Sequence, residues 1–101
     1  MASELMSRRD LDFLLYEWLD AESLTDRARF ADHGRDTFDA VLDLAEQVAT
    51  ENFAPHNKMN DAHEPTFDGQ RVHVIPEVKA ALDIYSRTGF VGATMDEDVG
   101  G

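Results

Sequence analysis

Apolar residues recur at helical spacing in three separate segments of the chain, and the first segment is Ser7–Leu19. Its apolar stripe consists of Leu11, Leu14, Leu15 and Trp18. Residues three or four positions apart share one face of a helix, so this spacing predicts a helix with a packed side. Ser7 suits the N-cap, because its hydroxyl can accept a hydrogen bond from the first turn. The stripe is typical of core packing, whereas Phe13 and Tyr16 lie outside it and favour contact with another domain or subunit.

The second segment, from Arg35 to Asn52, has the clearest amphipathic pattern. Its apolar face consists of Phe38, Val41, Leu42, Ala45, Val48 and Ala49. The acidic residues lie mostly off that face, which predicts one packed and one solvated side. Pro55 follows just past the expected end of the helix, where a proline can stop or bend it.

The third segment, Pro76–Thr88, begins with a residue that suits the first helical position. Its apolar face consists of Val78, Ala81, Leu82 and Tyr85. Gly89 suits the C′ position, which often takes a left-handed conformation. The three segments together predict an all-α fold with at least three helices and one long loop.

The connecting segments are polar. Residues 20–34 predict a connector with a short helix over Thr25–Ala31, and Gly34 suits either the end of that piece or the start of the next. Ala54–Val74 lacks helical periodicity and predicts a long ordered loop. Asp68-Gly69 is a recognised turn pair, so a short hairpin is expected there, with any strand between Pro65 and Val74.

The charge of the chain excludes several functions. Nine Lys and Arg stand against 21 Asp and Glu, which gives a formal net charge of -12. Such a field repels phosphate backbones and anionic membrane surfaces, so nucleic-acid binding is not expected. The chain has no cysteine, no signal peptide and no apolar run long enough for a membrane span, and a cytoplasmic protein is expected.

The sequence offers little catalytic or metal-binding chemistry. Metal-capable side chains gather in the predicted loop, namely His56, Asp61, His63 and Glu64. Their spacing matches no helical zinc pair, so a solvated, hydrogen-bonded loop is the favoured interpretation. Gly89 and Gly92 do not form a dinucleotide fingerprint. We therefore expect no catalytic, cofactor-binding or metal-ligating residue in this chain.

Five short motifs, in order along the chain, nevertheless resemble the N-terminal helical domain of acyl-CoA dehydrogenases. They are Phe53-Ala-Pro-His-Asn57, Phe67-Asp-Gly69, Pro76-Glu-Val-Lys-Ala-Ala-Leu82, Gly89-Phe-Val-Gly-Ala93 and Asp96-Glu-Asp-Val-Gly-Gly101. An additional stretch, Arg9–Tyr16, and the dipeptide Asp96-Glu97, where most of the family has Pro-Glu, make the chain similar to the longer bacterial subgroup that includes 3-methylthiopropanoyl-CoA dehydrogenases. The resemblance covers almost the whole chain, from about Arg8 to Gly101.

The resemblance implies that residues 1–34 are an N-terminal extension with the first helix, and that residues 35–101 begin the helical domain. It implies FAD as the cofactor of the full-length protein, an acyl-CoA substrate, and a homo-oligomer. In the family, a glutamate removes the α-proton of the thioester and the flavin accepts the β-hydride. Both groups would belong to the remainder of the same polypeptide, so no catalytic residue is carried onto this chain. The ending Val99-Gly100-Gly101 is expected to be a joint to that remainder.

Two alternatives to this interpretation stay open at the level of sequence. The first alternative is a stand-alone acidic helical interaction module, with Leu11, Leu14 and Trp18 as its binding stripe. The second is a small metal-binding protein that uses the loop histidines.

Overall fold

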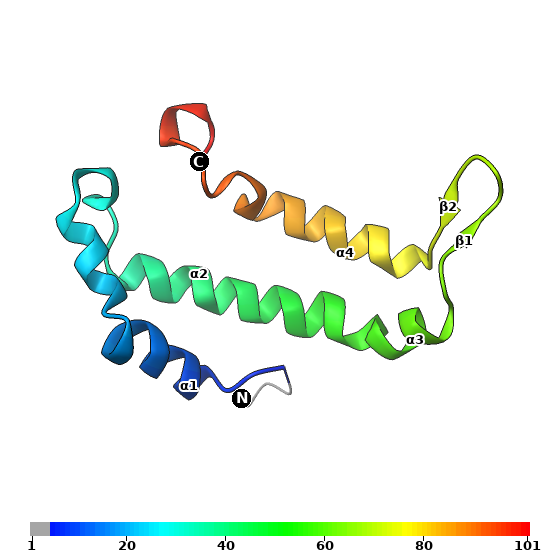
Figure 1. The fold of residues 1–101 in the computed structure, drawn as a ribbon, viewed down its shortest axis with the longest axis horizontal. Helices are drawn as coiled ribbons and strands as arrows, with labels where there is room; N and C mark the ends of the chain where they lie inside the picture. Colours follow the sequence, from blue (N-terminus) through cyan, green and yellow to red (C-terminus); the bar gives the residue numbers. More distant parts are fainter. Residues whose placement is uncertain (1–4) are drawn as a thin grey trace. The chain divides into compact units, whose positions relative to one another are not determined.

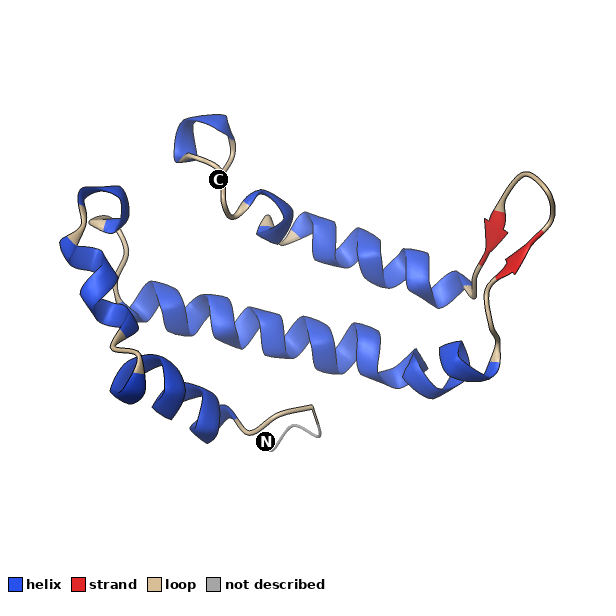
Figure 2. Cartoon of the chain, viewed as in Figure 1, coloured by secondary structure: helices blue, strands red, loops and turns tan. Residues whose placement is uncertain are grey.

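The structure is a computed structural model, and it describes residues 5–101. The described chain is mostly helical, with one small hairpin (Figure 1 and Figure 2). The α-helices are α1 (Arg8–Asp12), α2 (Arg35–Val48), α3 (Asn57–Ala62) and α4 (Pro76–Arg87). The strands are β1 (Thr66–Phe67) and β2 (Val72–His73). The prediction of an all-α chain is confirmed at this level.

The chain divides into two compact units, residues 1–47 and residues 48–101. Helix α2 belongs to the first unit except for its last residue, Val48. Each unit is described by itself below.

In the first unit, α1 begins at an N-cap serine, as predicted. The Ser7 hydroxyl accepts a hydrogen bond from the backbone N–H of Asp10 at 3.3 Å. The helix continues as a wider π-helix over Phe13–Trp18. Asp20 then takes a left-handed conformation with a φ of 50°, which turns the chain into two 3₁₀ helices, Ala21–Asp26 and Ala28–Phe30. The predicted short helix in the connector is thus present, but as 3₁₀ turns.

The predicted stripe on the first helix is wrong in two of its four positions. Leu11 and Leu15 are partly buried, whereas Leu14 is 40% exposed and Trp18 is 69% exposed. A π-helix has more residues per turn than an α-helix, so positions counted at 3.6 per turn leave the packed face. Tyr16, which was expected to contact another domain or subunit, is half-buried and contacts Asp39 and Arg35 of its own unit, so that prediction is wrong for Tyr16. Phe13 is 53% exposed.

The second unit begins where α2 changes its hydrogen-bonding pattern. A π-helix over Ala49–Phe53 and a 3₁₀ turn over Ala54–His56 follow α2, and α3 comes next. The prediction of a loop from residue 54 onward is therefore wrong for its first part. Pro55 lies in the first turn of the new 3₁₀ helix, where its missing N–H costs no hydrogen bond, so the proline redirects the helical path without ending it.

The predicted hairpin is confirmed between Pro65 and Val74. Strands β1 and β2 are antiparallel, with Thr66 opposite His73 and Phe67 opposite Val72. Gly69 lies in the turn with a φ of 97°, a conformation that glycine adopts without steric cost.

Helix α4 begins with Pro76 at its N-terminus and is followed by Gly89, whose φ is 87°, as the sequence predicts. It contacts the π-helix Ala49–Phe53. The most buried residues of the described chain are Ala81 (2% exposed), Val48 (6%) and His56 (8%). Leu82, which was expected on the packed face of α4, is 48% exposed. The core is therefore small, and many large apolar side chains meet solvent.

Candidate functional site

Arg8 ties the start of α1 to the middle of α2 within the first unit. Its guanidinium donates hydrogen bonds to the carboxylates of Asp12 at 3.2 Å, Asp43 at 2.7 Å and Glu46 at 3.2 Å. The bond to Asp43 is the largest cause of the raised pKa of Arg8, which stays positively charged at any pH of interest. The network joins α1 to α2 within the first unit.

A second polar cluster surrounds Tyr16. The phenol donates a hydrogen bond to an Asp39 carboxylate oxygen at 2.6 Å, and the Arg35 guanidinium lies over the ring, 4.0 Å from its centroid. Burial of the phenol and the bond to Asp39 raise the pKa of Tyr16 to about 12. Tyr16 is thus a neutral donor at physiological pH, and it is not poised as an acid or base.

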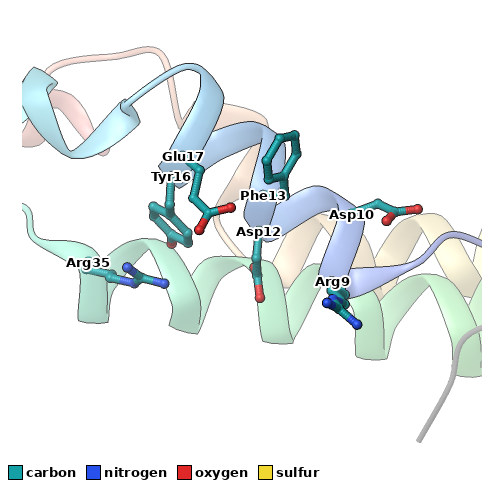
Figure 3. Close-up of a pocket in the computed structure, with 7 residues that line it drawn as sticks. All are labelled: Arg9, Asp10, Asp12, Phe13, Tyr16, Glu17 and Arg35. Atoms are coloured by element: carbon teal, nitrogen blue, oxygen red, sulfur yellow. The ribbon is translucent and has the colours of Figure 1, made fainter.

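A polar cavity of about 440 Å³ lies beside this cluster (Figure 3). It is lined by Arg9, Asp10, Asp12, Phe13, Tyr16, Glu17 and Arg35. The three carboxylates outnumber the two guanidinium groups, so the cavity does not favour an anionic ligand. Since Arg35 already covers the Tyr16 ring, the aromatic face in the cavity has a cation on it.

An apolar groove of about 230 Å³ lies in the same unit, and we call it the Phe38 groove. It is lined by Leu15, Tyr16, Ala21, Leu24, Phe38, Val41 and Leu42. Leu24 is 42% exposed and Val41 is 45% exposed, so the groove opens to solvent along these two residues. The prediction that Val41 belongs to the packed face of its helix is therefore wrong, although Phe38 and Leu42 are partly buried as expected.

In the second unit, His56 is buried and its ring lies 6.1 Å from that of Phe53. The hydroxyl of Thr50, in the π-helix, is buried and has no hydrogen-bond partner within residues 5–101. A π-helix often marks a functional position. Neither of the two cavities described above is lined by His56 or Thr50.

Asp68 holds the hairpin turn together. One of its carboxylate oxygens accepts the backbone N–H groups of Gln70 and Arg71 at 2.8 and 2.7 Å. The other lies 2.7 Å from Nε2 of His73. These contacts, with the His73 contact as the largest cause, lower the pKa of Asp68. The residues of the turn are exposed, and these contacts give Asp68 a structural role.

The four metal-capable residues of the predicted loop do not come together. His56 is buried in a 3₁₀ turn, Asp61 lies in α3, and Nδ1 of His63 contacts the backbone oxygen of Met59 at 3.0 Å. Glu64 is exposed in the segment that leads to β1. Across residues 5–101, no group of three His, Asp or Glu side chains is arranged to hold a metal ion.

Sequence reasoning missed the roles of Arg8 and Tyr16. The sequence does contain a signal for the Arg8 cluster. Residues Asp39, Asp43 and Glu46 recur at helical spacing and form an acidic stripe on α2, which favours a nearby cation.

No family model, curated protein or solved structure matches this chain. None of the helices within residues 5–101 combines the length and the apolar character needed to cross a bilayer.

Proposed function

We propose that this chain is the N-terminal helical portion of a FAD-dependent acyl-CoA dehydrogenase and that it is inactive by itself. The observation that carries the proposal is the conformation of its motif glycines. Gly69, Gly89 and Gly100 have φ values of 97°, 87° and 99°, and they are the glycines with positive φ in the described chain. Each belongs to one of the motifs that resemble the family, at a point where the chain turns.

Other motif residues also lie at junctions between elements. Pro55 bends the helical path, Asp68 closes the hairpin turn, and Pro76 begins α4. These are positions where backbone geometry restricts the residue type. Motifs that match at such positions support a shared chain path better than motifs on a solvated helix face do.

The exposure of apolar side chains fits a segment that more protein covers. Val91 is 70% exposed, Val99 is 66% exposed and Met95 is 58% exposed. Their burial would stabilise a larger enzyme, and helices of this kind would help to exclude water from a reaction centre.

Neither of the two cavities described in the first unit fits a flavin dinucleotide. The polar cavity of the first unit carries the carboxylates of Asp10, Asp12 and Glu17, which would repel a pyrophosphate, and the Phe38 groove is small and apolar. The proposal therefore assigns FAD, the acyl-CoA and the catalytic glutamate to the remainder of the polypeptide.

The test begins with the natural reading frame. We expect it to continue for several hundred codons past Gly101, and we expect the full-length product to be yellow and to be bleached by an acyl-CoA. The 101-residue chain, purified in parallel, should be colourless. A stop codon after Gly101, a colourless full-length product, or stoichiometric FAD on the short chain would each overturn the proposal.

A further inference from the structure

The Phe38 groove is an apolar surface that no side chain of its own unit fills. Phe38 and Leu42 lie in it partly buried, while the walls at Leu24 and Val41 stay more than two-fifths exposed. An exposed apolar surface of this kind often marks an interaction site.

The volume of the groove favours a protein partner over a small molecule. Pockets for small molecules usually have a volume of roughly 300–1,000 Å³. The Phe38 groove has about 230 Å³, and its exposed lining is almost entirely apolar. It lacks the placed polar groups that orient a small ligand, but it suits apolar side chains spaced along one face of a helix.

The charge around the groove specifies the partner further. From Asp10 to Asp26 the chain has six carboxylates and neither Lys nor Arg. Three of them, Asp20, Glu22 and Asp26, lie beside the groove residues Ala21 and Leu24 in sequence, whereas the other three line the polar cavity. Residues 1–47 carry twelve Asp and Glu against five Arg and no Lys.

Two of these arginines already lie against carboxylates. Arg35 contacts Glu22 at 3.3 Å and Asp39 at 3.9 Å, and Arg8 contacts the three acidic side chains described above. These contacts neutralise carboxylates as well as arginines, but acidic side chains still outnumber basic ones by twelve to five in residues 1–47. This excess attracts a cationic partner and repels an acidic one.

We infer that the Phe38 groove docks a basic amphipathic helix of a partner protein, with the apolar stripe of that helix in the groove and its Lys and Arg residues towards the acidic side chains of the segment that supplies Ala21 and Leu24. This inference stands on the groove and its charge, so it is independent of the dehydrogenase proposal.

The chain contains a single tryptophan, Trp18, on the π-helix that supplies Leu15 and Tyr16 to the groove. Binding can therefore be followed by Trp18 fluorescence and by the anisotropy of a labelled peptide added to the 101-residue chain. The probe is a synthetic Leu/Lys peptide with leucines at the spacing of one helical face. One control peptide has the same composition with the leucines scattered, and another replaces every Lys with Glu.

We expect the Leu/Lys peptide to bind, and we expect its affinity to fall as salt is added. Neither control peptide should compete with it. Equal binding by the scattered peptide would show non-specific attraction between charges, and equal binding by the Leu/Glu peptide would remove the role of charge. Either result would overturn the inference.

A matched pair of variants tests the location. Val41→Glu places a charge in the groove, whereas Val91→Glu adds the same charge at an exposed position of the other unit. We expect Val41→Glu to lower the affinity for the Leu/Lys peptide by at least about ten-fold, which corresponds to about 1.4 kcal/mol. Val91→Glu should change this affinity little. Leu24→Glu serves as a second groove variant if circular dichroism shows that Val41→Glu has lost helix.

Equal effects of the groove variants and Val91→Glu would overturn the inference. If no peptide binds, the groove is closed by another part of this chain or by a second copy, and the inference is likewise wrong. Light scattering would then distinguish those two occupants.

Discussion

At the scale of single residues, the first unit is organised by polar side chains that neutralise one another. Tyr16 combines three interactions, because it packs against the groove, donates to Asp39 and lies under Arg35. A neutral phenol is required for the first two of these, since an anionic one would repel the Asp39 carboxylate. The protonation of Tyr16 should therefore be linked to the folding of its unit.

Tyr16 should ionise at a pH near 12 in the folded chain, against an ordinary value of 10.0. The stabilisation that depends on neutral Tyr16 is complete below pH 10 and is lost as the pH rises towards 12, because the folded pKa is the higher one. The phenolate absorbance of the chain minus that of Tyr16→Phe gives the titration of Tyr16 alone. Asp39→Asn should leave the pKa of Tyr16 partly raised, since burial is the largest cause of the shift. A difference curve for the parent chain that is centred near pH 10 would contradict the prediction.

Asp68 should show the opposite shift, with a pKa below its ordinary value of 3.8. The contribution of its carboxylate to the hairpin turn is then present above pH 3.8 and disappears as the pH falls through the lowered pKa. NMR of the side-chain carboxyl carbon measures this directly. His73→Gln should raise the pKa of Asp68 part of the way back, because the contact with His73 is the largest cause of the shift and the backbone hydrogen bonds from Arg71 and Gln70 remain. Asp61→Asn in α3 should leave the pKa of Asp68 unchanged. No response to His73→Gln would show that the 2.7 Å contact does not form in solution.

At the scale of elements, the contact between α4 and the preceding π-helix holds helices of the second unit together. Ala81 of α4 is only 2% exposed, and α4 contacts the π-helix Ala49–Phe53. A small side chain lets the two backbones come together, so this position tolerates little added volume.

Ala81→Leu should therefore destabilise the second unit by about 1–3 kcal/mol, the usual cost of overpacking. Ala80→Leu, one position away and exposed, is the matched control and should change stability little. Urea unfolding followed by circular dichroism compares the two variants. Similar midpoints for both would mean that α4 does not pack through Ala81.

The elements that the sequence predicted well are those with a regular α-helical repeat or a specific turn residue. Arg35–Val48 and Pro76–Arg87 have such repeats, and Gly69 and Gly89 mark turns through their φ values. The failures have a physical cause in each case. The π-helix at Phe13–Trp18 changes the number of residues per turn, so a count at 3.6 placed Trp18 on the wrong face.

The helix after Pro55 was missed for a different reason. Asn57 and Asp61 are weak helix formers, and proline was read as a stop, so local preference argued against the helix that forms. The polar clusters at Arg8 and Tyr16 depend on contacts between residues 23 to 38 positions apart in sequence. The acidic stripe on α2 indicates that a cation lies near it, but the stripe does not indicate which residue supplies that cation. The Phe38 groove likewise needs three segments in one place, although each of its residues was visible in the sequence.

At the scale of the whole chain, two properties oppose each other. Large apolar side chains are exposed on many elements, while the formal net charge of -12 keeps copies apart at pH 7. The balance should depend on pH, because the sequence pI is about 4.4 and the repulsion between copies vanishes there.

Light scattering should accordingly show little association at pH 7 and low salt, and a rise as the pH approaches 4.4. Added salt at pH 7 should produce part of the same rise, since it screens the repulsion without changing any charge. The double variant Phe13→Ser with Trp18→Ser removes two side chains that are 53% and 69% exposed and leaves the charge unaltered. It should associate less than the parent chain at each pH, with unchanged helix content by circular dichroism, because these side chains are not part of the buried core. If the variant associates as strongly as the parent, the surface that brings copies together lies elsewhere, and neutralisation of charge alone governs the behaviour.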